Sequence, residues 1–277
     1  MIVDTHIHVT SRDHVTYPIA DPDWVPRRLE RLVLTGEDLI GLMDEAGVDR
    51  AVLVQATNTH GYDNSYAAEM AKAYPKRFST VACVNVSLSG AVDQLVESVR
   101  GGGMGGVRLF NSMTEQDSWL DEEPSTRIIA KARDLGVPVT MVSRHHDLGR
   151  VRAVVERFTD QSLVLDHLGF MPNLEQPPFS TSDEFLELAQ FPNLSLKFSA
   201  VNQWAVDQGA ESQDDYFKRI VEHYGAKRLM WGSNYPVTRF KSYPELAALG
   251  QEPFDFLSDE ERGWVMGENA SRLWHRT

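Results

Sequence analysis

Three histidines stand where parallel β-strands of this sequence are predicted to end. His6 and His8 form an HxH pair in VDTHIHV, and His167 closes the run SLVLDHLG. Because side chains alternate along a strand, His6 and His8 are expected on one face, together with Asp4. Neutral imidazoles can bind a divalent metal or accept a proton near neutral pH. These histidines are the first candidates for a catalytic site; the alternative for each is a hydrogen-bonded core histidine.

The run that ends at His167 is otherwise apolar. Alternation places His167 on the face of Leu163 and Leu165, and Asp166 on the opposite face. A polar pair at the end of a buried apolar run is costly unless it is hydrogen-bonded or functional. We therefore expect His167 in the site, and Asp166 either to hold a neighbouring loop or to orient a histidine.

Two cationic side chains lie inside predicted strands. Arg108 is at the centre of GVRLF, and Lys197 shares a face with Ser195 and Ser199 in LSLKFSA. A charge at such a position must be paired or must meet a ligand. The planar fork of Arg108 is suited to a substrate carboxylate or a polarised carbonyl, with an ion pair to an interior acid such as Asp4 as the alternative. Lys197 is a second candidate for substrate binding.

Further candidates lie in loops. After the fifth predicted strand, SRHHD offers Arg144 as a substrate contact and His145 or His146 as a metal ligand. The same segment also fits an ordinary loop in which Asp147 opens the next helix. His60, in the loop after the second strand, is a candidate pocket residue.

The elements that would position these residues follow one repeated pattern, in which a short apolar run precedes a longer segment of helical character. The eight runs begin near Met1, Arg50, Ser79, Gly106, Val137, Ser162, Leu194 and Arg228. From the second onward the starts are roughly 25 to 35 residues apart, which suits a strand, a crossover helix and two loops. The pattern predicts the α/β class and a single (β/α)8 TIM barrel over residues 1–277, with its active site at the C-terminal ends of the strands.

Two segments fall outside the repeat. About 27 residues, from Thr10 to Gly36, separate the first strand from its helix. Such a long connection is usually functional, so we expect a lid or a substrate-contacting arm, with a surface loop as the alternative. The last segment, LSDEERGWVMGENASRLWHRT, is expected to form a helix capped by Ser258 and docked on the barrel through Trp264 and Trp274.

Composition excludes several classes of protein. The chain is 42% hydrophobic and 24% charged, as ordinary globular proteins are, and its net charge of −13 disfavours nucleic-acid binding. No apolar stretch approaches the ~18 residues of a membrane span, and the N-terminus lacks a signal-peptide pattern, so we expect a cytoplasmic protein. Cys83 is the only cysteine, which excludes an intrachain disulfide. The expected partner is a small-molecule substrate, with neither nucleic acid nor membrane, and a homo-oligomer stays open.

The segments VDTHIHV, GVRLF, LDHLG, LKFSA, RLMWGSNYPV and ENASRLW together resemble the amidohydrolase-related family of the amidohydrolase superfamily. The resemblance spans almost the whole chain, and its DHLG motif is typical of the pyrone-dicarboxylate and sugar-acid lactonase branch rather than of the metal-dependent decarboxylases. It implies that His6 and His8 bind metal in some members and substrate in metal-free lactonases. It also implies that His167 and Arg108 polarise or anchor the substrate.

The sequence departs from the family pattern after the GS of RLMWGSNYPV. An aspartate that activates water or binds metal is common there, and this chain has Asn234, followed by Tyr235 as a further candidate substrate contact. An amide can position water but cannot take a proton, so we expect a histidine or a metal-bound hydroxide as the base. Losing an anionic ligand should also weaken metal binding. The ligands expected for one divalent ion, zinc or manganese, are His6, His8 and His167.

The leading hypothesis is a hydrolase that opens a lactone or related cyclic ester of a small carboxylated substrate. Activated water would attack a carbonyl whose developing charge is stabilised by His167 and Arg108. The expected catalytic residues are His6, His8, His167 and Asn234. The alternatives are a metal-dependent nonoxidative decarboxylase, a hydrolase of an amide, imide or C–C bond, and a barrel that binds a small molecule without catalysis.

Overall fold

The computed structural model of the protein describes residues 1–20, 33–110, 120–144, 147–170, 180–207 and 212–275. Eight strands follow one another in a single sheet, in the order of the sequence, and each neighbouring pair is parallel. The strands are β1 Val3–Ile7, β2 Arg50–Val54, β3 Phe78–Cys83, β4 Val107–Leu109, β5 Val139–Met141, β6 Leu163–Leu165, β7 Leu194–Phe198 and β8 Leu229–Trp231. Each begins within about two residues of its predicted start, so the eight-unit repeat is confirmed.

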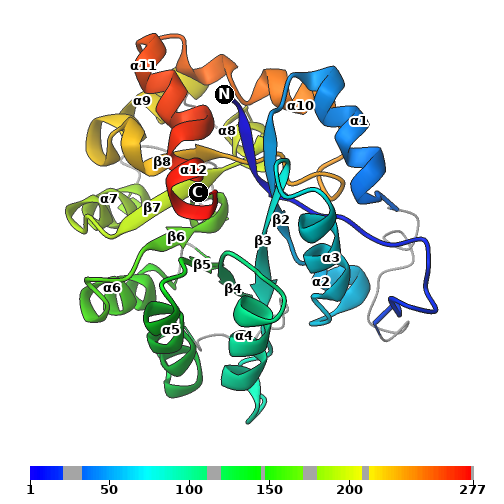
Figure 1. Cartoon of the computed structure of the whole chain (residues 1–277). Helices are drawn as coiled ribbons and strands as arrows, with labels where there is room; N and C mark the ends of the chain where they lie inside the picture. Colours follow the sequence, from blue (N-terminus) through cyan, green and yellow to red (C-terminus); the bar gives the residue numbers. More distant parts are fainter. Residues whose placement is uncertain (21–32, 111–119, 145–146, 171–179, 208–211, 276–277) are drawn as a thin grey trace.

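Helices alternate with the strands and surround the sheet (Figure 1). They are α1 Gly36–Ala46, α2 Thr57–His60, α3 Ser65–Ala73, α4 Ala91–Arg100, α5 Glu123–Leu135, α6 Leu148–Arg157, α7 Ser180–Glu187, α8 Ala200–Asp207, α9 Gln213–Tyr224, α10 Tyr243–Leu249, α11 Asp259–Gly263 and α12 Asn269–Trp274. Short helical turns add η2 Asp166–Phe170, η3 Leu188–Gln190, η4 Ala226–Arg228, η5 Glu252–Phe254 and the π-helical η6 Trp264–Glu268.

The last strand returns to the first and nearly closes the barrel. An isolated parallel bridge joins Ile7 to Tyr235, just beyond β8. The Asn234 N–H donates to the His6 carbonyl at 2.7 Å, and the His8 N–H donates to the Tyr235 carbonyl at 3.0 Å. The fold is therefore the predicted (β/α)8 barrel, and its seam passes through the HxH pair.

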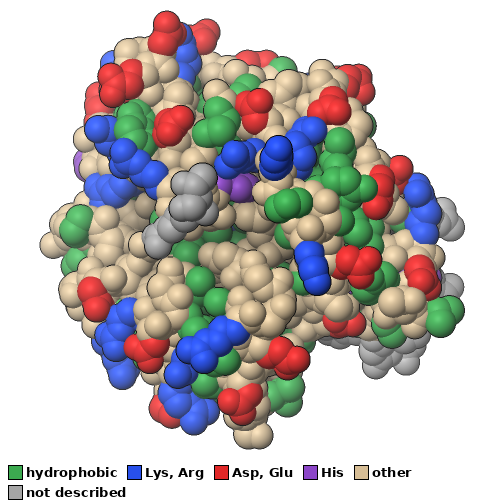
Figure 2. Space-filling model, in the orientation of Figure 1, with side chains coloured by type: hydrophobic (Ala, Val, Ile, Leu, Met, Phe, Trp, Pro, Cys, Tyr) green, Lys and Arg blue, Asp and Glu red, His purple; other side chains and the backbone are tan. Residues whose placement is uncertain are grey.

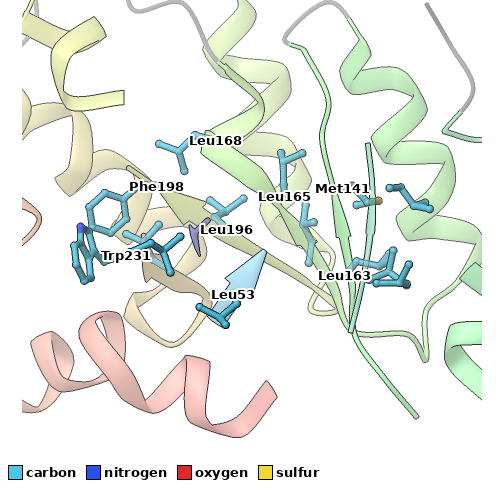
Figure 3. Packing of buried hydrophobic residues seen from close by; sticks show 14 of the residues in the cluster. Leu53, Met141, Leu163, Leu165, Leu168, Leu196, Phe198 and Trp231 are labelled. Atoms are coloured by element: carbon cyan, nitrogen blue, oxygen red, sulfur yellow. The ribbon is translucent and has the colours of Figure 1, made fainter. Parts of the chain in front are cut away.

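Alternate strand residues enter two separate apolar clusters. Outward-facing side chains pack with the helices, and Figure 3 shows part of this outer cluster. Its labelled members are Leu53, Met141, Leu163, Leu165, Leu168, Leu196, Phe198 and Trp231. The smaller inner cluster contains Val3, Val52, Val81, Val164 and Met230 from five strands, with Ala270 and Trp274 from α12. Trp274 thus packs against the inward-facing strand residues, and its helix α12 lies in front of the strands in Figure 1.

The first strand departs from strict alternation. Val3 belongs to the inner cluster and Ile7 to the outer one, and the pairing with β2 shifts register between Asp4 and Ile7. The prediction that Asp4 shares a face with His6 is therefore wrong, because the irregularity changes which residues point inward. The carboxylate of Asp4 accepts a hydrogen bond from Tyr243 of α10, which packs against α1.

Several remaining predictions concern the surface and the long first loop. Residues 21–32 of that loop lie outside the described residues, while its two ends are joined by hydrogen bonds between Thr10 and Leu34.

None of the described helices combines the length and apolar character that a membrane span requires. On the face seen in Figure 2, lysine and arginine side chains are interspersed with aspartate and glutamate, so the described residues form no uniformly basic surface there.

Candidate active site

The predicted catalytic residues meet at the C-terminal ends of the strands. His6 is the second-last residue of β1, and His8 directly follows that strand. His167 lies in η2, which directly follows β6. The His6 ring centroid is 5.0 Å from that of His8 and 4.6 Å from that of His167. Asn234, just beyond β8, is tied to His6 through the backbone. All four residues are buried, as a cluster shielded from water requires.

His167 reaches this cluster by a route that alternation does not predict. Leu163 and Leu165 face the outer cluster and Val164 the inner one, so the face assigned to His167 points away from the site. Three consecutive residues after β6 have left-handed backbones, with φ of 51° at His167, 53° at Leu168 and 68° at Gly169. This turn brings His167 inward, beside Asp166, which already lies on the inward face of Val164 as alternation predicts.

Asp166 is the electrostatic centre of the site. Its Oδ2 accepts a hydrogen bond from Arg108 Nε at 2.7 Å, and its Oδ1 lies 3.5 Å from Lys197 Nζ and 3.4 Å from His6 Nδ1. Burial alone would raise the pKa of Asp166, but Lys197, His6 and Arg108 hold that pKa well below its usual value. Arg108 therefore pairs with Asp166, and the interior acid suggested for it, Asp4, has other partners.

The three histidines are neutral at pH 7. Burial lowers the pKa of His8 to about 4 and that of His167 to about 3, while the pKa of His6 is lowered well below its usual value. The Nδ1 of His8 lies 3.0 Å from the Val54 carbonyl, which can only accept, so Nδ1 carries the proton and Nε2 is an acceptor. The Nδ1 of His167 lies 2.9 Å from the hydroxyl of Ser199.

His6 differs from the other two histidines. Within the described part of the chain, neither of its ring nitrogens has a hydrogen-bond partner, although the side chain is 1% exposed. Buried polar atoms are rarely left in this state unless a substrate, a water or an ion completes them.

One group of side chains among the described residues could hold a divalent ion. It consists of His6, Asp166 and His167, whose ligand atoms lie within 4.8 Å of one another. Imidazole nitrogen and carboxylate oxygen are ligands that zinc accepts, and the atoms of His6 and Asp166 that make no hydrogen bond to the described residues fit such an ion. This group contains Asp166 and not the expected ligand His8, and the identity of the metal ligands stays a prediction.

Asn234 has a left-handed backbone, with φ of 55°. Its Nδ2 donates to Thr238 Oγ1 at 3.0 Å, and its side chain also bonds to His8, which raises the pKa of that histidine slightly against the effect of burial. The neighbouring Gly232 allows the chain to pass close to His6, since a Cβ there would lie 2.6 Å from the His6 Cβ. The GSN segment thus sets the position of both histidines of the HxH pair.

The structure does not bring every loop candidate to this cluster. The Nε2 of His60 accepts from the Ser11 N–H and its Nδ1 bonds to the Pro18 carbonyl, so both nitrogens hold the first loop. The ring of Tyr235 packs against Tyr243, with centroids 5.7 Å apart. Arg144 is half-buried after β5, and residues 145–146 lie outside the described residues. Substrate contact by His60, Tyr235 or Arg144 stays a prediction.

Asp166 is the functional residue that sequence reasoning undervalued. The signal was present, because an aspartate followed by histidine at the end of a buried strand cannot remain unpaired. What the sequence did not disclose was the left-handed turn that directs His167 inward beside Asp166.

The chain is similar to known proteins over nearly its full length. The L-fucono-1,5-lactonase of Burkholderia ambifaria is 26% identical over 289 residues, which cover 98% of this chain and 94% of that protein. A structure from Pseudomonas putida, provisionally assigned as a 2-pyrone-4,6-dicarboxylic acid hydrolase, has a TM-score of 0.80 and 23% identity, with 98% and 96% of the two chains covered. An amidohydrolase from Burkholderia multivorans with bound zinc has a TM-score of 0.79 and 23% identity, with 99% and 98% covered.

The two structures share the barrel fold. The sequence itself matches the amidohydrolase family over residues 3–276, which is nearly its full length. The resemblance seen in the motifs is thereby confirmed, and the chain belongs to the amidohydrolase family.

Proposed function

We propose that the protein is a hydrolase that opens a lactone or related cyclic ester of a small carboxylated substrate. The full-length similarity to L-fucono-1,5-lactonase supports the reaction class. The single structural observation that carries the proposal is His6, a buried histidine whose ring nitrogens make no hydrogen bond to the described residues and which lies beside two further neutral histidines. Such a cluster can bind the carbonyl and water of an ester and take up a proton.

The proposed chemistry divides among a few groups. A neutral histidine takes the proton of the attacking water, and we favour His8 because the Val54 carbonyl fixes its Nε2 as an acceptor. His167 and Arg108 stabilise the charge that develops on the carbonyl oxygen. Asn234 positions water or substrate, since its amide has no usable basicity.

Charge balance supports the carboxylated substrate. Arg108 and Lys197 are two buried cations, and the site residues around them include one buried carboxylate, Asp166. The excess positive charge favours an anionic ligand in a site that excludes water. Arg108 uses Nε for Asp166, so we propose that its terminal amino groups meet the substrate carboxylate.

A divalent ion, zinc or manganese, would be held by His6, Asp166 and His167, and when bound it would polarise the carbonyl and lower the pKa of a bound water. The family match over residues 3–276 supports our proposal of one domain, residues 1–277. A cytoplasmic location stays a prediction.

A substrate panel tests the reaction class. Purified protein should hydrolyse members of a set of lactones that includes L-fucono-1,5-lactone and 2-pyrone-4,6-dicarboxylate, assayed with and without chelator beside a set of aromatic acids. Release of carbon dioxide from an aromatic acid would favour the decarboxylase alternative. Saturable binding without turnover would favour the non-catalytic barrel.

The assignment of the site is tested on the best substrate of that panel. His6→Ala and His167→Ala should each lower kcat/KM by at least ~10²-fold, the usual scale for losing an acid–base or electrostatic group. His223→Ala, an exposed histidine on α9, is the matched control and should leave kcat/KM unchanged. Near-normal activity of either site variant would show that the site is elsewhere.

A further inference from the structure

Lys197 is a charged side chain enclosed in the barrel. Its side chain is 1% exposed, and within the described residues its Nζ has no hydrogen-bond partner. On one side Nζ lies 3.5 Å from Asp166 Oδ1. On the other it lies 4.7 Å from the centre of the Trp274 ring, which closes the interior from α12. The ammonium group is therefore held between a carboxylate and an aromatic face.

Burial and the charge of Arg108 lower the pKa of Lys197, and both of these neighbours oppose that effect by favouring the charged form. A carboxylate attracts the ammonium directly, and the negative face of an indole ring is the strongest of the aromatic cation acceptors. A buried lysine without such neighbours would be strongly destabilising. Lys197 is therefore a buried cation held next to Asp166.

The oxygen that faces Lys197 is the same one that faces the histidines. Asp166 Oδ1 is 3.4 Å from His6 Nδ1, and Asp166 is the sole carboxylate in the group that could hold a divalent ion. An ion in that group would share this oxygen with the ammonium and would be repelled by it at close range. The second oxygen of Asp166 is already used by Arg108.

We propose that Lys197, held in place by Trp274, acts as a built-in cation that weakens the affinity of the His6, Asp166 and His167 group for divalent metal. The two buried cations then supply around Asp166 part of the positive charge that an ion would otherwise bring. The proposal concerns metal affinity and does not depend on the substrate. It can therefore fail while the proposed lactonase activity stands, and the reverse also holds.

The test is the zinc affinity of the full-length protein, measured by competition with a chelating indicator in the absence of substrate. Lys197→Met keeps the length of the side chain and removes its charge, and it should bind zinc at least about tenfold more tightly, in the range found for residues that adjoin metal ligands. Lys197→Arg keeps the charge and should stay close to wild type. Lys227→Met, which removes an exposed lysine above Trp264, is the matched control and should change nothing.

A second substitution locates the bound ion. Adding His6→Ala to Lys197→Met should abolish the gain if zinc occupies the predicted group. The proposal is overturned if Lys197→Met binds zinc no more tightly than wild type, or if Lys197→Arg binds as tightly as Lys197→Met. Circular dichroism checks folding, with Lys197→Gln as a second neutral variant. If both neutral variants fail to fold, Lys197 serves stability rather than metal exclusion, and the proposal is likewise overturned.

Discussion

Replacing Asp166 by asparagine removes the carboxylate that contacts two buried cations. Asp166 is fully buried, and the side chains of Arg108 and Lys197 are 5% and 1% exposed. Asparagine keeps the size of the side chain and one oxygen, so packing changes little. The main effect of Asp166→Asn is therefore electrostatic.

The burial of both cations sets the expected loss in the free energy of unfolding. Breaking a buried pair by removing one partner typically costs about 3 to 5 kcal/mol, because a charge is left buried and unpaired. Two cations lose their partner here, but Lys197 can release its proton to limit the loss. We therefore expect Asp166→Asn to lower the free energy of unfolding by about 3 to 5 kcal/mol.

Urea denaturation of the wild type and the variant measures this difference directly. The matched control is Asp44→Asn, which breaks an exposed pair with Arg77 at 2.8 Å and should cost less than about 1 kcal/mol. A loss below about 1 kcal/mol for Asp166→Asn, equal to that of the control, would refute the claim that Asp166 holds two buried charges in place.

Two further predictions concern the histidines and Asn234. Burial lowers the pKa of His8 to about 4, so a base at this position should stay unprotonated down to that pH. We therefore expect kcat/KM to fall only as the pH drops through about 4. A fall of kcat/KM to half its value near pH 6.5, with the protein still folded, would contradict this. Asn234→Ala should lower kcat/KM by less than about tenfold, while Asn234→Asp should raise the zinc retained after dialysis, because it restores an anionic ligand. If Asn234→Ala is fully active and Asn234→Asp retains no more zinc than wild type, Asn234 does not belong to the site.

The barrel could be predicted because each of its strands carries its own signal. Runs such as RAVLVQA are apolar on both faces, and a parallel sheet covered on both sides requires that composition. Helix ends are also set locally, since Gly47 and Gly136 adopt φ of 68° and 69° directly after α1 and α5. Signals of this kind depend on a few adjacent residues.

The site was predicted less completely because it depends on departures from regular backbone. Alternation gave the wrong face for Asp4, which lies beside a register shift, and for His167, which enters a left-handed turn. Asp166 lies inward, on the face of Val164 that alternation gives it. Residue types still pointed to the right positions, because histidine and charge inside buried strands need a reason. The sequence thus predicts which residues matter better than it predicts where each side chain points.

The charge balance of the site also accounts for the unusual Asn234. With Arg108 and Lys197 set against Asp166, the described site residues carry one excess positive charge, which suits a substrate carboxylate. An aspartate at position 234 would add the anionic ligand that a tightly bound metal requires, and would cancel that excess. Asn234→Asp should therefore weaken binding of the carboxylated substrate while it strengthens binding of metal. On this reasoning the amide at position 234 and the lysine at position 197 act in the same direction, since both favour an anionic substrate over a divalent ion.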